Sequence, residues 1–141
     1  EEARLRLEEH GVVVIKDATA NKGGVTSSSL EVFVSLALTD EEYEEHMVVK
    51  NGKVSDFRKR YIDEIIRTIR ENARLEFDLL WREHERTKTP FTVLTNMVSA
   101  KINAITDAVR ESELPRMAAI RDRVISAYAP KPLMELLGLE R

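Results

Sequence analysis

The sequence predicts a mainly α-helical protein that opens with a single strand–loop–helix corner of an α/β fold. Two observations lead to this prediction. Residues 12–15 are continuously apolar and β-branched, which is typical of a strand buried on both faces. From residue 39 onward, apolar side chains recur almost entirely at helical spacing. We therefore expect residues 1–38 to form the corner and residues 39–141 to form a helical extension that packs as one unit.

The corner is built from short segments separated by glycines. Gly11 follows a charged stretch and is expected to stop a helix. Gly23 and Gly24 are expected to lead from a polar loop into the next helix. Because a lone strand has two unpaired edges, we expect it to pair with another copy or to stay poorly ordered in isolation. The predicted segments are a helix end at 1–10, a strand at 12–15, a loop at 16–22 and a helix at 25–38.

The extension is predicted to hold five helices separated by turn signals. Thr39 starts a capping box with a glutamate three residues later. Ser55 and Thr92 are expected to cap two further helices. Asn51 and Gly52 form a strong turn signal, which indicates either a minimal hairpin or a plain turn between helices. The predicted helices cover residues 39–48, 55–87, 92–110, 115–128 and 133–137.

Composition narrows the classes of function. The chain has 22 Lys and Arg against 25 Asp and Glu, a net charge of −3, which gives no electrostatic reason to expect nucleic acid or an anionic membrane. It has no cysteine, which excludes disulfides, thiolate nucleophiles and cysteine metal sites within it. No apolar run approaches the roughly 20 residues that span a bilayer. The chain begins at Glu1, in what reads as the middle of a helix, so we expect further residues upstream.

Charged and aromatic side chains outside the corner are interpreted as structural. The three histidines lie far apart and form no His-Glu-x-x-His motif, so we predict no metal site. The acidic run at 40–45 suits a helix start and a solvated face. Basic residues between 58 and 74 alternate with acids, which argues against nucleic-acid binding. Trp81 continues an apolar stripe and is expected in the core or an interface.

The part of the chain that looks suited to hold a ligand is residues 20–31. Backbone N–H groups at a helix start after a strand can bind an anion. As a phosphate-binding loop, however, the block lacks the required Gly-Lys-Ser/Thr end, because Gly24 is followed by Val25 and then by Thr26, Ser27 and Ser28. In a purely structural interpretation, Gly23 and Gly24 only make a tight turn.

A more specific interpretation comes from the spacing in this block. Residues 11–17 read Gly-Val-Val-Val-Ile-Lys-Asp and residues 20–25 read Ala-Asn-Lys-Gly-Gly-Val. Asn21, Ser28 and Glu31 then match the last conserved block of glutamate dehydrogenases, in which a serine and a glutamate lie seven and ten positions after the asparagine. The block resembles the large NAD-specific enzymes more than the small hexameric ones. The resemblance is strong over about residues 11–38.

The resemblance implies that the corner is the last part of a Rossmann-like dinucleotide-binding domain and lines part of a substrate pocket. Ser28 would hydrogen-bond the side-chain carboxylate of glutamate or 2-oxoglutarate. Asn21 would border the substrate and the nicotinamide end of NAD. Gly23 and Gly24 would let the backbone approach the cofactor. Lys22 replaces the small residue common in the family and is assigned either to the surface or to a further anion contact.

The same resemblance implies reversible oxidative deamination of L-glutamate to 2-oxoglutarate and ammonia with NAD. The lysine, the aspartate and the glycine fingerprint which that chemistry needs are not found here, so we expect no catalytic residue and no turnover by this chain alone. Expected partners are the upstream part of the chain and further copies in a homo-oligomer, in the cytoplasm or in a eukaryotic mitochondrial matrix. Two alternatives stay open: a non-enzymatic helical interaction module built on residues 55–87, and a small nucleotide-binding protein using residues 22–27.

Overall fold

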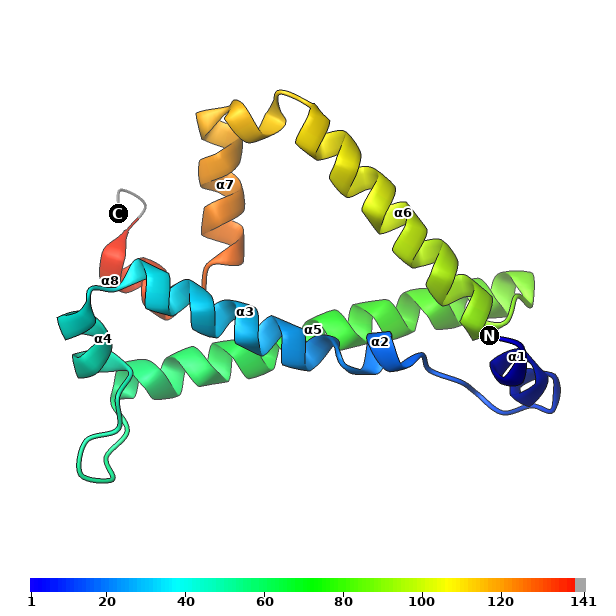
Figure 1. Ribbon diagram of the computed structural model, residues 1–141, viewed down its shortest axis with the longest axis horizontal. Helices are drawn as coiled ribbons and strands as arrows, with labels where there is room; N and C mark the ends of the chain where they lie inside the picture. Colours follow the sequence, from blue (N-terminus) through cyan, green and yellow to red (C-terminus); the bar gives the residue numbers. More distant parts are fainter. Residues whose placement is uncertain (139–141) are drawn as a thin grey trace. The chain divides into compact units, whose positions relative to one another are not determined.

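The computed structural model describes residues 1–138, without the side chains of Asp17 and Ala18, and this part of the chain is mainly helical, as predicted (Figure 1). It divides into two compact units. Unit 1 comprises Glu1–Lys22 with Glu71–Arg116, and unit 2 comprises Gly23–Arg70 with Met117–Arg141. The helices are α1 (Glu2–Glu9), α2 (Asp17–Ala20), α3 (Lys22–Ala37), α4 (Asp40–His46), α5 (Asp56–Thr87), α6 (Phe91–Glu111), the 3₁₀ turn η1 (Leu114–Arg116), α7 (Ala118–Tyr128) and α8 (Lys131–Leu137).

The predicted strand at residues 12–15 does not form. This stretch has no regular secondary structure, and Val12 and Val13 are 47% and 53% exposed. The physical reason is that a strand needs a neighbouring strand to satisfy its backbone N–H and C=O groups, and no other strand lies in the described part of the chain. Residues 12–15 are therefore an apolar, β-branched segment that lacks the inter-strand hydrogen bonds expected of a strand.

The loop and the helix that follow also differ from the prediction. Residues 16–22 are not purely a loop, since α2 occupies Asp17–Ala20. Helix α3 begins at Lys22, three residues before the predicted start. Gly23 and Gly24 consequently lie within the first turn of α3 and do not make a left-handed turn ahead of it.

In unit 1, α1 ends as the sequence predicts. Gly11 adopts φ +80°, the left-handed conformation that glycine tolerates best. The Gly11 N–H donates to the Glu8 carbonyl at 2.9 Å, and the Val12 N–H donates to the Leu7 carbonyl at 3.1 Å. These two bonds form a Schellman motif, which satisfies the last carbonyls of α1 and ends the helix.

The core of unit 1 lies between the second half of α5 and the start of α6. Leu80, Phe91 and Leu94 are buried, with Val98 packed against them. The predicted cap of α6 is wrong, because the helix starts at Phe91 after Pro90, and Thr92 already lies inside it. The capping acceptor comes from α1 instead: the Glu8 carboxylate accepts hydrogen bonds from the Thr92 N–H and Oγ1, both at 3.0 Å.

The core of unit 2 gathers side chains from α3, α5 and α8. Val34, Leu38, Tyr61 and Leu133 are buried together. Tyr61 is 1% exposed, and its hydroxyl donates to the Leu30 carbonyl at 2.7 Å. A buried tyrosine with a satisfied hydroxyl joins the long helix α5 to α3 by both packing and a hydrogen bond.

The connection from α3 to α5 in unit 2 follows the local signals closely. Thr39 and Glu42 form both bonds of the capping box at the start of α4. Asn51 and Gly52 have φ +53° and +73°, and Lys50 pairs with Lys53 in an isolated antiparallel bridge, so the Asn-Gly signal produces the minimal hairpin. Ser55 Oγ accepts from the Arg58 N–H at 3.0 Å, which confirms the predicted cap of α5.

Two later helix starts differ by a few residues from the prediction. The predicted start at Pro115 falls in the short 3₁₀ turn η1, and α7 begins at Ala118. Helix α8 begins at Lys131, with Pro132 in its first turn, where a missing N–H costs nothing. It ends before Gly138, which has φ +73°.

Candidate functional site

The glycine corner is the first turn of a sixteen-residue helix. The leading N–H groups of an α-helix have no partner within it and carry a partial positive charge. Asn21 directly precedes α3, and Gly24 is exposed within its first turn. A helix start with an exposed glycine lets an anionic group approach the backbone closely, which is the chemistry that the sequence predicted for this block.

The two glycines serve different purposes. A Cβ placed on Gly23 would lie 3.2 Å from Ile69 Cγ2, closer than side chains ordinarily pack. Gly23 therefore lets α3 approach α5 inside unit 2, which is a packing role that the sequence alone did not indicate. Gly24 is exposed, and its carbonyl accepts hydrogen bonds from two serine hydroxyls. The expectation that both glycines approach a cofactor stays a prediction.

Ser28 is exposed on α3, and its hydroxyl donates to the Gly24 carbonyl at 2.5 Å. Leu30, two residues further along α3, is buried, and its carbonyl accepts a hydrogen bond from the Tyr61 hydroxyl. Ser28 lies on the exposed part of the helix. To donate to a bound carboxylate it must rotate away from Gly24, which costs only one intrahelical contact.

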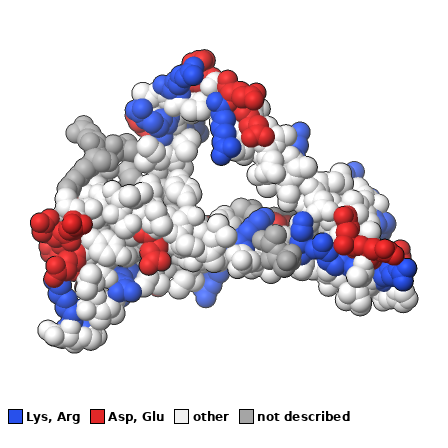
Figure 2. Space-filling model, in the orientation of Figure 1, with Lys and Arg blue, Asp and Glu red and all other residues white. Residues whose placement is uncertain are grey.

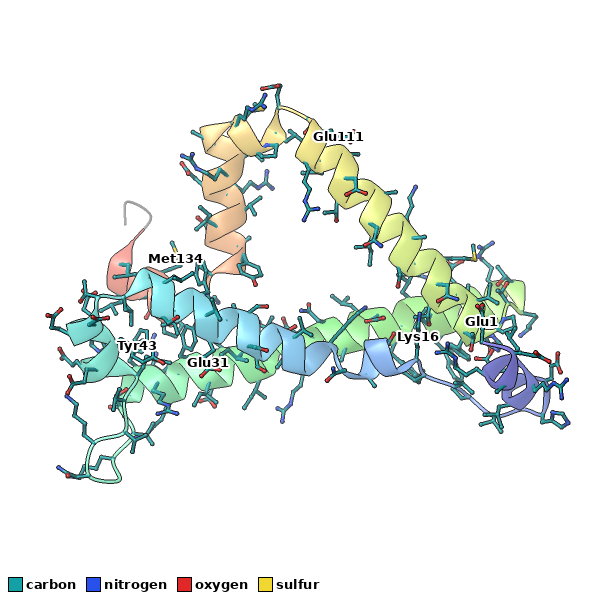
Figure 3. All side chains as sticks on the ribbon, viewed as in Figure 1. Glu1, Lys16, Glu31, Tyr43, Glu111 and Met134 are labelled. Atoms are coloured by element: carbon teal, nitrogen blue, oxygen red, sulfur yellow. The ribbon has the colours of Figure 1, made fainter. Side chains whose placement is uncertain are left out.

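Ser27 provides an internal comparison for Ser28. Its hydroxyl also donates to the Gly24 carbonyl, at 2.9 Å, so the two neighbouring serines make the same intrahelical bond. They point around the helix in different directions, because successive residues turn by about 100°. Glu31, the last residue of the matched spacing, is also exposed on α3 (Figure 3).

Lys22 has a specific partner within unit 1. Its Nζ lies 2.6 Å from Oε2 of Glu76 on α5, and the Glu76 side chain is only 13% exposed. Of the two roles that the sequence left open, the surface position agrees with the structure, because Lys22 is exposed. Its ammonium is not free, since the ion pair with Glu76 attaches the start of α3 to α5.

A second lysine holds the other end of the same segment. Lys16 Nζ donates to Asn96 Oδ1 on α6 at 2.8 Å, and Asn96 Nδ2 donates to Glu1 Oε1 at 3.2 Å. Figure 3 labels Lys16 and Glu1. The sequence did not point to Asn96, Glu76 or Glu8. Each lies 54 to 84 positions away from its partner, so no local spacing could have revealed these pairs.

The histidines and Trp81 make structural contacts. The His10 ring lies 2.7 Å from the Arg6 carbonyl, and the His46 ring packs against Phe57. His84 stacks on Phe91, with ring centroids 4.5 Å apart. Trp81 packs beside Phe91 at the edge of the unit 1 core while 42% of it stays exposed. Among the described residues, no three His, Cys, Asp or Glu side chains come together as a metal site would require.

Several basic residues of α5 pair with acids. Ion pairs join Lys59 to Asp56 and Arg67 to Glu64 within the helix, and Arg60 contacts Glu135. Figure 2 shows the two signs interspersed over the visible face, with acidic side chains gathered over α4. A surface of mixed sign gives no continuous basic stripe for a phosphate backbone. Among the helices of residues 1–138, none is long and apolar enough to cross a membrane.

The structure shows a mainly helical chain with an exposed helix start at Lys22–Gly24, and comparison with known proteins places it in a family. A family model described as Glutamate/Leucine/Phenylalanine/Valine dehydrogenase matches residues 1–88. The chain belongs to this family.

The similarity to individual relatives extends over the whole chain. It is 50% identical over 141 residues to Glutamate dehydrogenase 2 of Dictyostelium discoideum, covering 100% of this chain. It is 43% identical over 141 residues to the NAD-specific glutamate dehydrogenase of Neurospora crassa and 36% identical over 140 residues to that of Saccharomyces cerevisiae, covering 99% and 96% of this chain. The chain spans only 13–14% of the length of these relatives. No solved structure matches it.

Proposed function

We propose that this chain is the C-terminal part of an NAD-dependent glutamate dehydrogenase and that its glycine corner forms one wall of the glutamate site. The observation that carries this proposal is the exposed start of α3, where Asn21, Gly24 and Ser28 occupy the positions of the family block. The identity to relatives named NAD-specific glutamate dehydrogenases over the full length of the chain supports it. In this proposal residues 1–38 close the dinucleotide-binding domain and residues 39–141 are its helical extension.

The chemistry assigned to this wall is recognition of the substrate's side-chain carboxylate. The Ser28 hydroxyl would donate one hydrogen bond to that carboxylate, and the positive end of α3 would favour its charge. The Asn21 amide can both donate and accept, which suits a position between substrate and cofactor. Bound NAD would supply the acceptor for the hydride that leaves the substrate Cα. The residues of this chain would bind and orient the substrate, and the groups that move protons would come from elsewhere in the enzyme.

The exposed apolar surface supports a larger assembly. A soluble chain rarely leaves many large apolar side chains open unless other polypeptide covers them. In the segment 12–15, Val12, Val13 and Ile15 are exposed, and the helices carry further exposed apolar side chains. The exposed apolar residues of α3 are Val25, Val32 and Leu36.

Removing the Ser28 hydroxyl is the direct test of the substrate wall. In the full-length enzyme that contains this chain, Ser28→Ala should raise the KM for glutamate about tenfold or more, because one hydrogen bond to a charged group is lost. The KM for NAD should stay within about twofold of its original value. Steady-state kinetics with each substrate varied in turn measures both constants.

Ser27→Ala is the matched control, because it removes an equivalent hydroxyl and an equivalent bond to Gly24. An unchanged KM in Ser27→Ala with a raised KM in Ser28→Ala assigns the effect to substrate contact. Ser28→Thr, which keeps the hydroxyl, should recover part of the affinity. Equal behaviour of the two alanine variants would refute the role of Ser28.

A further expected result concerns the chain by itself. The purified 141-residue chain, incubated with glutamate and NAD, should form NADH no faster than the same mixture without protein. The reason is that the proton-transfer groups and the glycine fingerprint are not found in its sequence. Absorbance at the NADH band measures this directly. Sustained, enzyme-dependent NADH formation would show that the catalytic groups are in this chain after all.

A further inference from the structure

The segment that carries Asn21 is attached at both of its ends to the helical extension. Lys16, just before α2, donates to Asn96 on α6 at 2.8 Å. Lys22, the first residue of α3, pairs with Glu76 on α5 at 2.6 Å. Between the two lysines lie only the single turn of α2 and Asn21 itself. All of these residues belong to unit 1.

The acceptor on α6 is itself held in one orientation. A lysine ammonium can only donate, so the Asn96 oxygen must face Lys16 and its amide nitrogen must face away. That nitrogen donates to Glu1 at 3.2 Å, so both ends of the amide are used. One helical turn earlier, Thr92 of α6 is bound by Glu8. The face of α6 that receives Lys16 is therefore fixed by two further contacts from the N-terminal residues.

The acceptor on α5 is partly removed from water. The Glu76 side chain is 13% exposed, whereas the Lys22 side chain is 52% exposed. Charges attract more strongly where solvent screens them less, so this pair should hold its geometry better than the open ion pairs elsewhere on α5. The apolar core of Leu80, Phe91 and Leu94 joins α5 to α6 independently of both lysines. The two lysine contacts are therefore not needed to join α5 to α6, and their main effect is to fix the position of the segment between the two lysines.

We propose that Lys16–Asn96 and Lys22–Glu76 form a clamp through which the helical extension holds Asn21 at the substrate and cofactor boundary. This inference rests on the proposed function and gives the helical extension a task within it. Asn96 and Glu76 are positioning residues, since they act on the site through the two lysines and touch no substrate themselves. Loss of either contact lets the segment move, and a displacement of about 1 Å in a substrate-orienting group is enough to slow a reaction strongly.

The test uses the full-length enzyme with single substitutions at the two acceptors. Glu76→Ala and Asn96→Leu should each lower kcat/KM for glutamate roughly five- to fiftyfold while Tm stays within about 2 °C. Glu76→Gln, which keeps an acceptor oxygen for Lys22, should recover part of the loss. The exchange Lys22→Glu with Glu76→Lys re-forms the pair and should recover more than either single substitution.

Asp78→Ala is the matched control. Asp78 lies on α5 two residues after Glu76 and pairs with Arg74 at 3.5 Å, and both side chains of this pair are exposed. Its removal should leave kcat/KM within about twofold of the original enzyme. A Glu76→Ala enzyme that behaves like Asp78→Ala overturns the clamp, and so does a loss that neither Glu76→Gln nor the exchange restores.

The Ser28→Ala enzyme separates failure of the clamp from failure of the proposed function. A raised KM in Ser28→Ala together with unchanged kinetics in Glu76→Ala and Asn96→Leu rejects the clamp and keeps the substrate wall. Unchanged kinetics in Ser28→Ala reject the substrate wall itself. A fall in Tm that accompanies and matches the kinetic loss in the acceptor variants also rejects the clamp, because it would show that the contacts only stabilise the fold.

Discussion

Tyr61→Ala is expected to lower the free energy of unfolding by about 3–5 kcal/mol, the largest effect of any substitution considered in this chain. Tyr61 is 1% exposed at the centre of the unit 2 core, where it packs with Val34, Leu38 and Leu133. Truncation leaves a cavity between α3, α5 and α8 and removes the bond to the Leu30 carbonyl. Urea unfolding followed by circular dichroism measures the change.

Two milder variants divide this effect into its parts. Tyr61→Phe keeps the ring and should cost only about 1 kcal/mol, the ordinary value of one hydrogen bond. Tyr128→Phe removes an exposed phenolic hydroxyl in the same unit and should cost about 0.5 kcal/mol or less. A Tyr61→Phe variant as unstable as Tyr61→Ala would mean that the hydroxyl, and not the packing of the ring, holds this core together.

Tyr61 also predicts how stability varies at high pH. Burial raises the pKa of the Tyr61 hydroxyl well above its ordinary value of about 10. The folded state then binds the proton more tightly than the unfolded state, so this group's contribution to stability is complete below the unfolded pKa and is lost as pH rises beyond it. Stability should fall above about pH 10, and Tyr61→Phe should flatten that fall.

Glu8→Ala is expected to lower the free energy of unfolding by about 2–4 kcal/mol, because it removes the capping acceptor of α6 and orphans a buried N–H and hydroxyl. The Thr92 residue that receives both bonds is only 2% exposed, so water cannot readily replace the carboxylate. Amide hydrogen exchange at Thr92 is the specific measurement, since the loss of its acceptor should accelerate that one amide the most.

Glu9→Ala is the control for this prediction, since Glu9 neighbours Glu8 on α1 and is exposed. It should leave the Thr92 amide protected. Glu8→Gln keeps an acceptor oxygen for Thr92, so it should retain most of the stability. Its amide nitrogen would take the place of the second carboxylate oxygen, Oε2, which is buried and has no hydrogen-bond partner. If Glu8→Gln were as damaging as Glu8→Ala, the negative charge at the helix start would be the important property, and not the hydrogen bonds.

Local structure could be predicted where the deciding contacts lie within a few residues. The Thr39–Glu42 capping box, the Ser55 cap, the turn at Asn51 and Gly52 and the Gly11 stop all depend on neighbours in the sequence. The family block was likewise visible as a spacing of Asn21, Ser28 and Glu31. The strand at 12–15 was predicted wrongly. Its β-branched side chains are typical of a buried strand, but pairing needs a second strand, and none lies in the described residues.

The sequence by itself therefore indicated a mainly helical chain of the glutamate dehydrogenase family, and the ligand-binding role of its corner stays a prediction. Helical periodicity, helix caps and motif spacing all depend on residues that lie close together in the sequence. The tertiary structure decided where the corner is attached. It pairs Lys16 with Asn96, Lys22 with Glu76 and Glu8 with Thr92. It also shows that Gly23 allows α3 to pack closely against α5. Such contacts join residues far apart in the chain, and only folding brings their donors and acceptors within hydrogen-bonding distance.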